Sequence, residues 1–313
     1  MLKVCYKSEK SDIATVYVGK FDNGKYVEFV ESTQPPIPKD KKWVLIVSTM
    51  FGCPVDCRIC DCGGSFAGML SKSEIIEQID FLINLYYPGK KIPTHKFKIQ
   101  FARMGEPSLN TAVLDVLDEL PELYDAPGLL PSLSSVAPAG TEKFFEKLLD
   151  IKRKLYHSSF QLQFSIHSTD EKQRDFLIPV KKWSFEQISD YCRDFVGTGD
   201  KKVSLNFALG KDFILNTDKL LKYFNPEIFL LKITPVNPTY KAAANGIETF
   251  IKPGQTDYSF INILRSAGYD VILSLGEAEE NQIGSNCGQY IWRSKVDQTG
   301  EIPAYNYSLE RLS

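Results

Sequence analysis

The sequence lacks a long apolar run, an excess of positive charge, and any repeat or low-complexity tract. The best apolar stretch, residues 43–51, is too short to span a membrane and has the length of a core strand. Lys and Arg number 37 against 39 Asp and Glu, so the net charge is −2. This balance argues against long RNA or DNA as a partner, although a local basic patch stays open. The first five residues do not have the layout of a secretory signal.

The overall amino-acid composition is that of a folded protein. Apolar residues make up 43% and charged residues 24%, which excludes wholesale disorder. Seven cysteines are present, and four of them fall within residues 53–62. An odd number with such crowding indicates a metal site in a reducing compartment instead of a disulfide framework. We therefore expect a cytoplasmic protein.

The order of predicted elements indicates an α/β fold. An Asn23-Gly24 turn between alternating segments predicts a β-hairpin over 14–30, and a proline-rich linker follows it. After the linker, strands and helices alternate. The predicted strands cover 43–49, 97–102, 130–134, 160–166, 203–209, 228–233 and 271–275. The predicted helices cover 71–87, 112–120, 142–154, 184–195, 218–223 and 258–267.

Repeated βα units imply a parallel sheet with right-handed crossovers. About six units suit an open, partial (β/α)6 barrel, whose chemistry collects at the carboxyl ends of the strands. We divide the chain into an N-terminal hairpin extension and linker over 1–40, a barrel over 41–276, and a C-terminal tail over 277–313. The tail is expected to pack back over the barrel.

The cysteine cluster follows the first predicted barrel strand. The spacing of Cys53, Cys57 and Cys60 allows three thiolates to hold three irons of a 4Fe-4S cluster and to leave the fourth iron open. An open iron can bind the amino and carboxylate groups of a cofactor. A structural zinc site is the alternative, with Cys62 as a fourth ligand. The Cys60-Asp61-Cys62 spacing is too tight for the usual zinc arrangement.

The Cys-x3-Cys-x2-Cys pattern in this position resembles the radical S-adenosylmethionine superfamily. Further segments, in family order, are similar to its RNA adenine methyltransferases that modify carbon 2 or carbon 8. These segments are Phe-Ala-Arg-Met-Gly-Glu-Pro-Ser-Leu-Asn at 101–110, Ser-Ile-His at 165–167 with Arg174 and Pro179, Lys-Ile-Thr-Pro-Val-Asn-Pro at 232–238, and Asn-Cys-Gly-Gln-Tyr at 286–290.

The resemblance implies a 4Fe-4S cluster on Cys53, Cys57 and Cys60, with S-adenosylmethionine beside it. It also implies the cofactor contacts. Met104, Gly105 and Glu106 would hold the methionyl amino group, Ser134 the methionyl or ribose part, Ser165 the ribose, and Asn237 the edge of the cofactor or substrate. Asn206 and Asn216 are further candidates for the pocket. His167 is a proton shuttle or, as we prefer, a hydrogen-bonded structural residue.

Cys287 is the catalytic cysteine that the resemblance implies. In the relatives, the corresponding cysteine accepts a methyl group from one S-adenosylmethionine. A 5′-deoxyadenosyl radical from a second molecule then removes a hydrogen atom from it, and the methylene radical adds to an sp2 carbon. The superfamily chemistry also implies a one-electron donor such as flavodoxin or ferredoxin. A buried free cysteine is the plain alternative at this position.

The sequence departs from this branch at several points. The relatives resolve their covalent adduct with a second cysteine seven residues before the first cluster cysteine, where this chain has Ile46. Cys62 is the nearest substitute, and Cys5 and Cys192 are weaker ones. Arg103 stands where the family has glycine. The relatives also carry an N-terminal RNA-binding domain before the hairpin, whereas this sequence starts almost at the hairpin.

These departures and the net charge lead us to expect a small-molecule, nucleotide or peptide substrate, because RNA phosphates need Lys and Arg contacts. Three alternatives stay open. The enzyme could abstract hydrogen without transferring a methyl group, or it could methylate RNA with the help of a partner. The chain could also be an iron–sulfur or zinc protein with a sensing or structural role.

Overall fold

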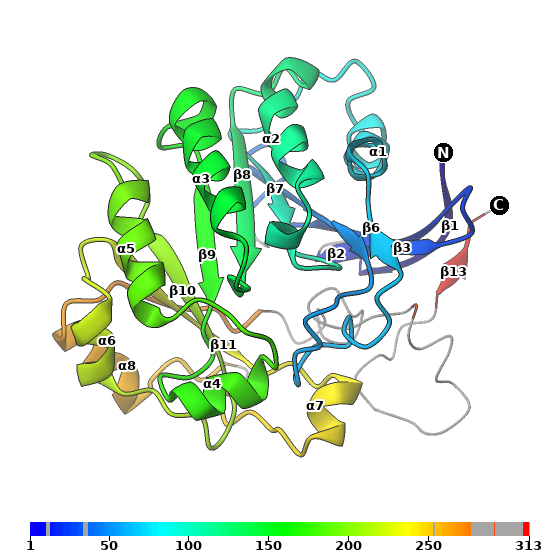
Figure 1. Cartoon of the computed structure of the whole chain (residues 1–313). Helices are drawn as coiled ribbons and strands as arrows, with labels where there is room; N and C mark the ends of the chain where they lie inside the picture. The colour runs from blue at the N-terminus through cyan, green and yellow to red at the C-terminus, as the bar shows by residue number, and fades with distance from the viewer. Residues whose placement is uncertain (11–12, 34–36, 253, 277–290, 292–308, 313) are drawn as a thin grey trace.

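The chain folds around one large sheet flanked by helices (Figure 1). The structure, a computed structural model, describes residues 1–10, 13–33, 37–252, 254–276, 291 and 309–312. The sheet has eleven strands in the order β12-β11-β10-β9-β8-β7-β4-β3-β2-β1-β13. The strands from β4 to β12 pair in parallel, and those from β3 to β13 pair antiparallel. This is the expected α/β sheet of βα units, preceded by an antiparallel extension.

The strands of this sheet are β1 (Leu2–Lys10), β2 (Ala14–Phe21), β3 (Tyr26–Ser32), β4 (Lys42–Val47), β7 (Lys96–Phe101), β8 (Leu129–Ser135), β9 (Gln161–Ser165), β10 (Val203–Leu209), β11 (Phe229–Pro235), β12 (Val271–Leu273) and β13 (Glu310–Arg311). A separate pair, β5 (Met50–Phe51) and β6 (Gly68–Met69), frames the cysteine loop. Within the described residues, no helix has the length and apolar character needed to cross a bilayer.

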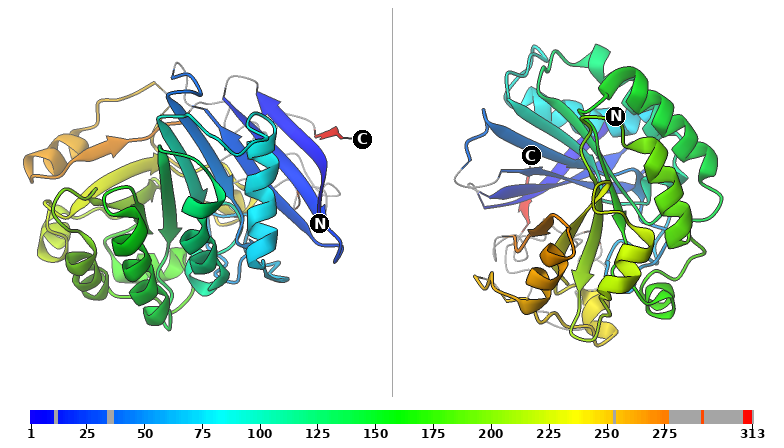
Figure 2. Two further views of the ribbon diagram at one scale, coloured as in Figure 1. Left: turned by 90° about the horizontal axis from the view of Figure 1, so that it is seen from above. Right: turned by 90° about the vertical axis from the view of Figure 1, so that its left-hand side faces the viewer.

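The helices are α1 (Lys72–Asn84), η1 (Pro107–Leu109), α2 (Ala112–Leu123), α3 (Glu142–Ile151), η2 (Lys152–Tyr156), α4 (Glu171–Leu177), α5 (Phe185–Phe195), α6 (Thr217–Tyr223), α7 (Tyr240–Ala244) and α8 (Ser259–Ser266). Capping boxes at Ser71 and Ser184 start α1 and α5, as the sequence predicts. Helices α1, α2, α3 and α5 cover one face of the twisted sheet (Figures 1 and 2), and α4 and α7 lie beyond the carboxyl ends of the strands.

Alternation along each barrel strand separates a helix-covered face from an inner face. On β4, Trp43, Leu45 and Val47 are fully buried and pack in the core that includes the apolar side of α1. The alternate residues Val44 and Ile46 face the other way and are only partly buried. The inner face of β4 is therefore less completely buried than its helix-covered face.

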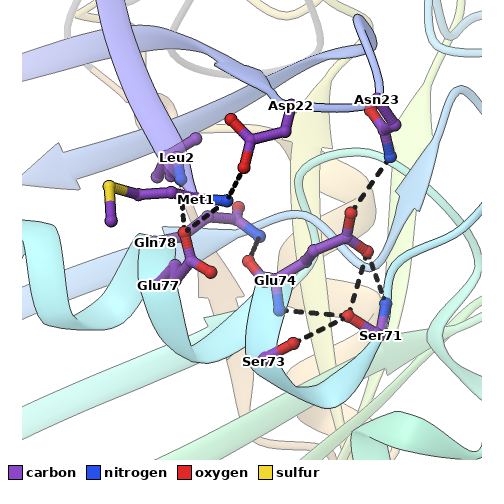
Figure 3. A network of polar contacts seen from close by, with 9 residues as sticks. All are labelled: Met1, Leu2, Asp22, Asn23, Ser71, Ser73, Glu74, Glu77 and Gln78. Atoms are coloured by element: carbon purple, nitrogen blue, oxygen red, sulfur yellow. Dashed lines mark hydrogen bonds and ion pairs between the residues drawn. The ribbon is translucent and has the colours of Figure 1, made fainter.

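The antiparallel extension is continuous with the barrel strands. Its β2–β3 hairpin turns at Asn23-Gly24, with Gly24 at a φ of 79°, and β3 pairs with β4 through Val30 and Ile46. The turn rests on the first turn of α1 (Figure 3), where Asn23 Nδ2 donates to Glu74 Oε1 at 3.2 Å. The extension is thereby held to the first βα unit.

The elements that were not predicted from the sequence include β1, α4 and α7. Strand β1 has mostly half-buried residues, so its apolar alternation is weak. The helices α4 and α7 are short, and their N-caps Asp170 and Thr239 stand in loops that showed no capping box. The predicted helix 142–154 is α3, followed by the π-helical turn η2.

Candidate active site at the carboxyl edge of the sheet

The cysteine loop runs from β5 to β6 at the carboxyl edge of the sheet. Cys53, Cys57 and Cys60 are partly exposed on it, whereas Cys62 is buried, with 2% of its surface exposed. Asp56 in the middle of the loop has a φ of 61°, and Asp56 lies against Gly63, where a side chain would be 2.5 Å from the Asp56 Cα. The loop therefore doubles back tightly and needs glycine at position 63.

Hydrogen bonds with two segments, one after β9 and one after β11, hold this loop. The Arg58 N–H donates to the Leu177 carbonyl of α4 at 2.9 Å. The Thr239 hydroxyl, after β11, donates to the Ile59 carbonyl at 3.0 Å. The Asp61 carboxylate accepts the Lys241 N–H of α7 at 2.9 Å and so caps that helix from outside. Asp61 was not identified from the sequence, because its partner lies 180 residues away.

Cys62 belongs to the cysteine loop and contacts the Met104-Gly105-Glu106 segment. Its sulfur is hydrogen-bonded with Cys53 and accepts the Gly105 N–H. The hydrogen bond with Cys53 and burial raise the pKa of the Cys62 thiol well above its usual range. The thiol is therefore protonated at neutral pH. Its hydrogen bonds join the cysteine loop to the segment that follows β7.

The Met104-Gly105-Glu106 segment follows β7 directly. The Met104 carbonyl accepts the N–H groups of Thr49 and Met50 at 2.8 and 3.1 Å. Gly105 has a φ of 100°, and a Cβ there would lie 2.6 Å from the Met50 Cβ. Only glycine fits this contact, which fixes the segment against the start of the cysteine loop.

Glu106 is a buried carboxylate, with 4% of its surface exposed. Its Oε1 accepts from the hydroxyls of Ser108 and Ser135 at 2.7 and 2.6 Å, and its Oε2 accepts the Val136 N–H at 2.9 Å. Burial raises the pKa of the Glu106 carboxyl, and these hydrogen bonds oppose that rise. These contacts join the ends of β7 and β8. The contact with a cofactor amino group that was predicted for Glu106 would have to form besides these hydrogen bonds.

The predicted residues on β8, β9 and β10 share the inner face. Gln163 Nε2 donates to the Ser134 hydroxyl at 3.2 Å, whereas Ser135 points to Glu106. Ser165 is aligned with Asn206 in the parallel pairing of β9 and β10. Asn206 Oδ1 is buried and has no hydrogen-bond partner among the described residues. The structure thus places Ser134, Ser165 and Asn206 on neighbouring strands of one surface.

Asn237 and Asn216 lie in different surroundings. Asn237 follows β11, two residues before the Thr239 that binds the cysteine loop, so it lies close to that loop. Asn216 is the N-cap of α6, and its side chain accepts the Lys219 N–H at 2.8 Å. The structure therefore gives Asn216 a local structural role.

His167 is a buried, neutral histidine. Its Nδ1 accepts the Ala208 N–H at 3.1 Å, and its φ of 62° is left-handed. Burial lowers the pKa of His167 from 6.5 to about 4, and the nearby Arg174 guanidinium adds to this shift. The geometry matches the structural role preferred from the sequence.

Replacing His167 by asparagine should remove a pH dependence of stability. Because the folded-state pKa is depressed, the unfolded chain binds more protons between about pH 6.5 and pH 4, and stability is lost as the pH falls through this window. From pH 7 to pH 5, the wild type should lose about 2 kcal/mol more unfolding free energy than the variant. Asparagine keeps an acceptor for the Ala208 N–H and tolerates the positive φ. Urea unfolding at both pH values measures the difference, and equal losses would contradict it.

The residues of the cysteine loop fit an iron–sulfur cluster by their donor chemistry. Three partly exposed thiols lie within eight residues beside the Met104-Gly105-Glu106 segment, and thiolates are the usual ligands of such clusters. The three sulfur atoms do not form a ready metal site. Among the described residues, no group of three or more His, Cys, Asp or Glu side chains is placed to hold a metal ion. The fit therefore rests on the kind, number and exposure of the donors.

Asn206 Oδ1 is a buried acceptor without a partner among the described residues, and Asn206 is aligned with Ser165 on the neighbouring strand. Such an acceptor suits a ribose hydroxyl, which S-adenosylmethionine carries. The Nε and Nη2 of Arg174 are also buried and unpartnered in the part of the chain that the structure describes. The Arg174 guanidinium lies over the Phe185 ring of α5, and its Nη1 donates to the Trp183 carbonyl at 2.8 Å. Cys287, the predicted methyl carrier, lies outside the described residues.

Comparisons with known proteins indicate the kind of protein to which the chain is similar. No family model matches the chain. The chain is 25% identical over 282 residues to the probable dual-specificity RNA methyltransferase RlmN of Trichormus variabilis, covering 87% of this chain and 74% of the relative. It is 29% identical over 211 residues to the protein of the same name from Parasynechococcus marenigrum, covering 66% of this chain and 58% of the relative.

A solved structure has the same fold. It is a radical SAM methyltransferase from Sphaerobacter thermophilus, with a TM-score of 0.69 and 19% identity over 92% of this chain and 80% of that one. These likenesses support the radical S-adenosylmethionine superfamily for the chain, as a methyltransferase-like enzyme that resembles the RlmN branch. Radical S-adenosylmethionine methyltransferases use a 4Fe-4S cluster and S-adenosylmethionine. The expectation drawn from the cysteine spacing and the four segments is thereby confirmed.

Proposed function

We propose that this radical S-adenosylmethionine enzyme transfers a one-carbon unit, carried on Cys287, to an sp2 carbon of a substrate other than RNA. The observation that carries the proposal is the meeting of the cysteine loop with the Met104-Gly105-Glu106 segment at the carboxyl edge, through the Gly105 N–H and the Cys62 sulfur. Ligands of βα barrels bind at this edge. In this proposal Cys53, Cys57 and Cys60 hold the cluster.

The bound cluster and cofactor supply the one-electron cleavage of S-adenosylmethionine, which yields methionine and a 5′-deoxyadenosyl radical. The protein positions the cofactor. Met104, Gly105 and Glu106 orient its methionyl amino group. Ser134 and Ser165 bind its ribose side, and Asn237 faces the substrate. Cys287 accepts a methyl group as a thioether, losing its thiol proton, and presents that carbon to the substrate.

Position 46 sets this chain apart from the branch that modifies RNA, and it leaves the resolving step to another thiol. The branch that modifies RNA resolves its adduct with a cysteine there, whereas Ile46 packs in an apolar cluster with Val16, Val18 and Val30. An isoleucine has no group that can attack a covalent adduct. The overall charge of −2 also provides no surplus of cations for a long phosphate backbone.

RNA methylation is the second candidate, because the curated relatives are named as RNA methyltransferases. Reconstituted enzyme supplied with S-adenosylmethionine labelled on its methyl group separates the two. Total RNA and a protein-free extract of small metabolites serve as the substrates. We expect label in the low-mass fraction and not in RNA. Label that enters RNA at a rate matching turnover would replace this proposal with the RNA alternative.

Cys62 is the proposed resolving thiol, because it is buried in the cysteine loop and its sulfur accepts the Gly105 N–H of the neighbouring segment. In Cys62→Ala the substrate should stay covalently attached to the enzyme, visible as a mass increase of the intact chain. The Cys5→Ala variant is the control. Normal release by Cys62→Ala would remove this role.

The proposed partners and location follow from the chemistry. Cleavage of S-adenosylmethionine consumes an electron, so we propose a one-electron donor such as flavodoxin or ferredoxin. A cluster with partly exposed thiolate ligands persists best in a reducing compartment, and we propose the cytoplasm.

A further inference from the structure

Helix α7 is bonded to the part of the cysteine loop that carries the second and third ligand cysteines. The Thr239 hydroxyl, at the start of α7, donates to the Ile59 carbonyl at 3.0 Å. Asn245 Nδ2, at the end of α7, donates to the Arg58 carbonyl at 3.3 Å. Figure 1 shows α7, in yellow, beside the blue loop. The two ends of α7 therefore bind the two residues that separate these cysteines.

One residue of α7, Lys241, binds two carboxylates of the cysteine loop. Its backbone N–H donates to Asp61 Oδ1 at 2.9 Å. Its ammonium group donates a hydrogen bond to Asp56 Oδ1 and forms an ion pair with that carboxylate. In the sequence, Asp56 directly precedes Cys57, and Asp61 directly follows Cys60. Lys241 therefore brackets the Cys-x2-Cys segment by binding the residue on each side of it.

The bracketed segment is a tight turn that packs on α7. The Cys60 N–H donates to the Cys57 carbonyl at 3.2 Å, which closes the turn between the two cysteines. Ile59 of the turn and Ala242 of α7 are buried in the same apolar cluster. Polar and apolar contacts thus both hold the turn against this helix.

The ammonium group of Lys241 reaches Asp56 across a position that has no side chain. A Cβ added at Gly63 would lie 2.9 Å from the Lys241 Nζ and 2.5 Å from the Asp56 Cα. Asp56 has a left-handed φ of 61°, which Asp and Asn adopt more readily than most residues. The ion pair therefore fixes the side chain of a residue whose backbone sets the direction of the loop just before Cys57.

We propose that Lys241 is a positioning residue that holds Cys57 and Cys60 as a preset pair of cluster ligands. It acts through Asp56 and Asp61. The inference rests on the proposed role of the three loop cysteines as ligands of the cluster. Ordering a loop costs conformational entropy, and contacts that order it in advance reduce the cost of binding. Loss of the ammonium group should therefore weaken retention of the cluster.

The test is the rate at which an iron chelator removes iron from the full-length, anaerobically reconstituted enzyme. The main variant is Lys241→Met, which removes the ammonium group and keeps the backbone N–H that binds Asp61. We expect iron loss to become about tenfold faster, as is usual when a residue that orients metal ligands is replaced. Hydrogen–deuterium exchange of β7 and β8 peptides should stay unchanged and so report an intact fold. Iron loss within twofold of the wild type would overturn the proposal.

Two variants and their combination show whether the ammonium group acts through Asp56. Lys241→Arg keeps the cation and should restore most of the retention that Lys241→Met loses. Asp56→Asn removes the charge of the partner and tolerates the positive φ, so it should lose iron as fast as Lys241→Met. The double variant should lose iron no faster than either single variant, because both remove the same contact. Failure of Lys241→Arg to restore retention, or additive effects in the double variant, would contradict this role.

The matched control is Lys219→Met. Lys219 of α6 is a partly exposed lysine whose Nζ lies 3.8 Å from the Glu171 carboxylate of α4, so it joins two other short helices by an ion pair. This variant should keep iron loss within twofold of the wild type. Acceleration as large as with Lys241→Met would show general loosening and refute a specific bracket.

Hydrogen–deuterium exchange of the iron-free enzyme distinguishes failure of the bracket from failure of the proposed function. The Lys241 amide donates to Asp61, so Asp61→Ala should make its exchange at least tenfold faster, measured on overlapping peptides of α7. Unchanged exchange would show that the bracket does not exist. If the wild type takes up no cluster, the proposed function fails, although the exchange result still decides on the bracket. If the wild type binds the cluster and Lys241→Met retains it equally well, the proposed function stands and the bracket does not position the ligands.

Discussion

Replacing Cys53, Cys57 or Cys60 singly by alanine should abolish cluster incorporation and cleavage of S-adenosylmethionine. Reconstituted wild-type enzyme should hold about four irons with matching sulfide, and each variant less than about one. Formation of 5′-deoxyadenosine should fall to the rate without enzyme, because the electron can enter the cofactor only through the cluster. Iron and sulfide analysis of the anaerobic protein and chromatography of the nucleoside measure both.

The matched control is Cys5→Ala. Cys5 is a partly exposed cysteine like the three ligands, but it lies on β1, where its thiol donates to the Lys3 carbonyl. This variant should keep its iron and its cleavage rate. Cys192 is a poorer control, because it is fully buried in α5 and its truncation would leave a cavity. Full iron in any one of the three ligand variants would contradict the assignment, and zinc without sulfide would revive the structural zinc site.

Most of the fold could be predicted because each barrel strand buries one face. The fully buried Trp43, Leu45 and Val47 alternate with partly exposed residues, and this period of two is visible in the sequence. Strand β1 was missed because most of its residues are half-buried or exposed, so no such period appears. Helix α7 was missed because it is five residues long and is capped by Asp61 from the cysteine loop.

The candidate site, too, could be predicted only in part. Placement at strand ends is a local property, so Ser134, Ser165 and the Met104-Gly105-Glu106 segment could be located from the sequence. Contacts between distant segments could not. Nothing in the sequence indicates that Glu28 pairs with Arg103, 75 residues on, or that Ser135 is bound by Glu106 while Ser134 faces inward. Such contacts follow from strand order and register, which depend on the whole sheet.

Replacing Cys287 by alanine should stop product formation and still permit abortive formation of 5′-deoxyadenosine. The variant keeps the cluster cysteines and the cofactor contacts, so cleavage of S-adenosylmethionine can proceed. It lacks the sulfur that accepts the methyl group, so no carbon reaches the substrate. In the wild type, mass spectrometry of the peptide containing Cys287 should show one added methyl group after anaerobic incubation with S-adenosylmethionine.

The result of this experiment decides between the two radical mechanisms. Cys5→Ala, which lacks the thiol of β1, should keep both the methyl group on Cys287 and the product. Normal turnover by Cys287→Ala would exclude a methyl carrier at this position. A wild type that cleaves S-adenosylmethionine but never carries a methyl group would instead favour hydrogen abstraction without methyl transfer.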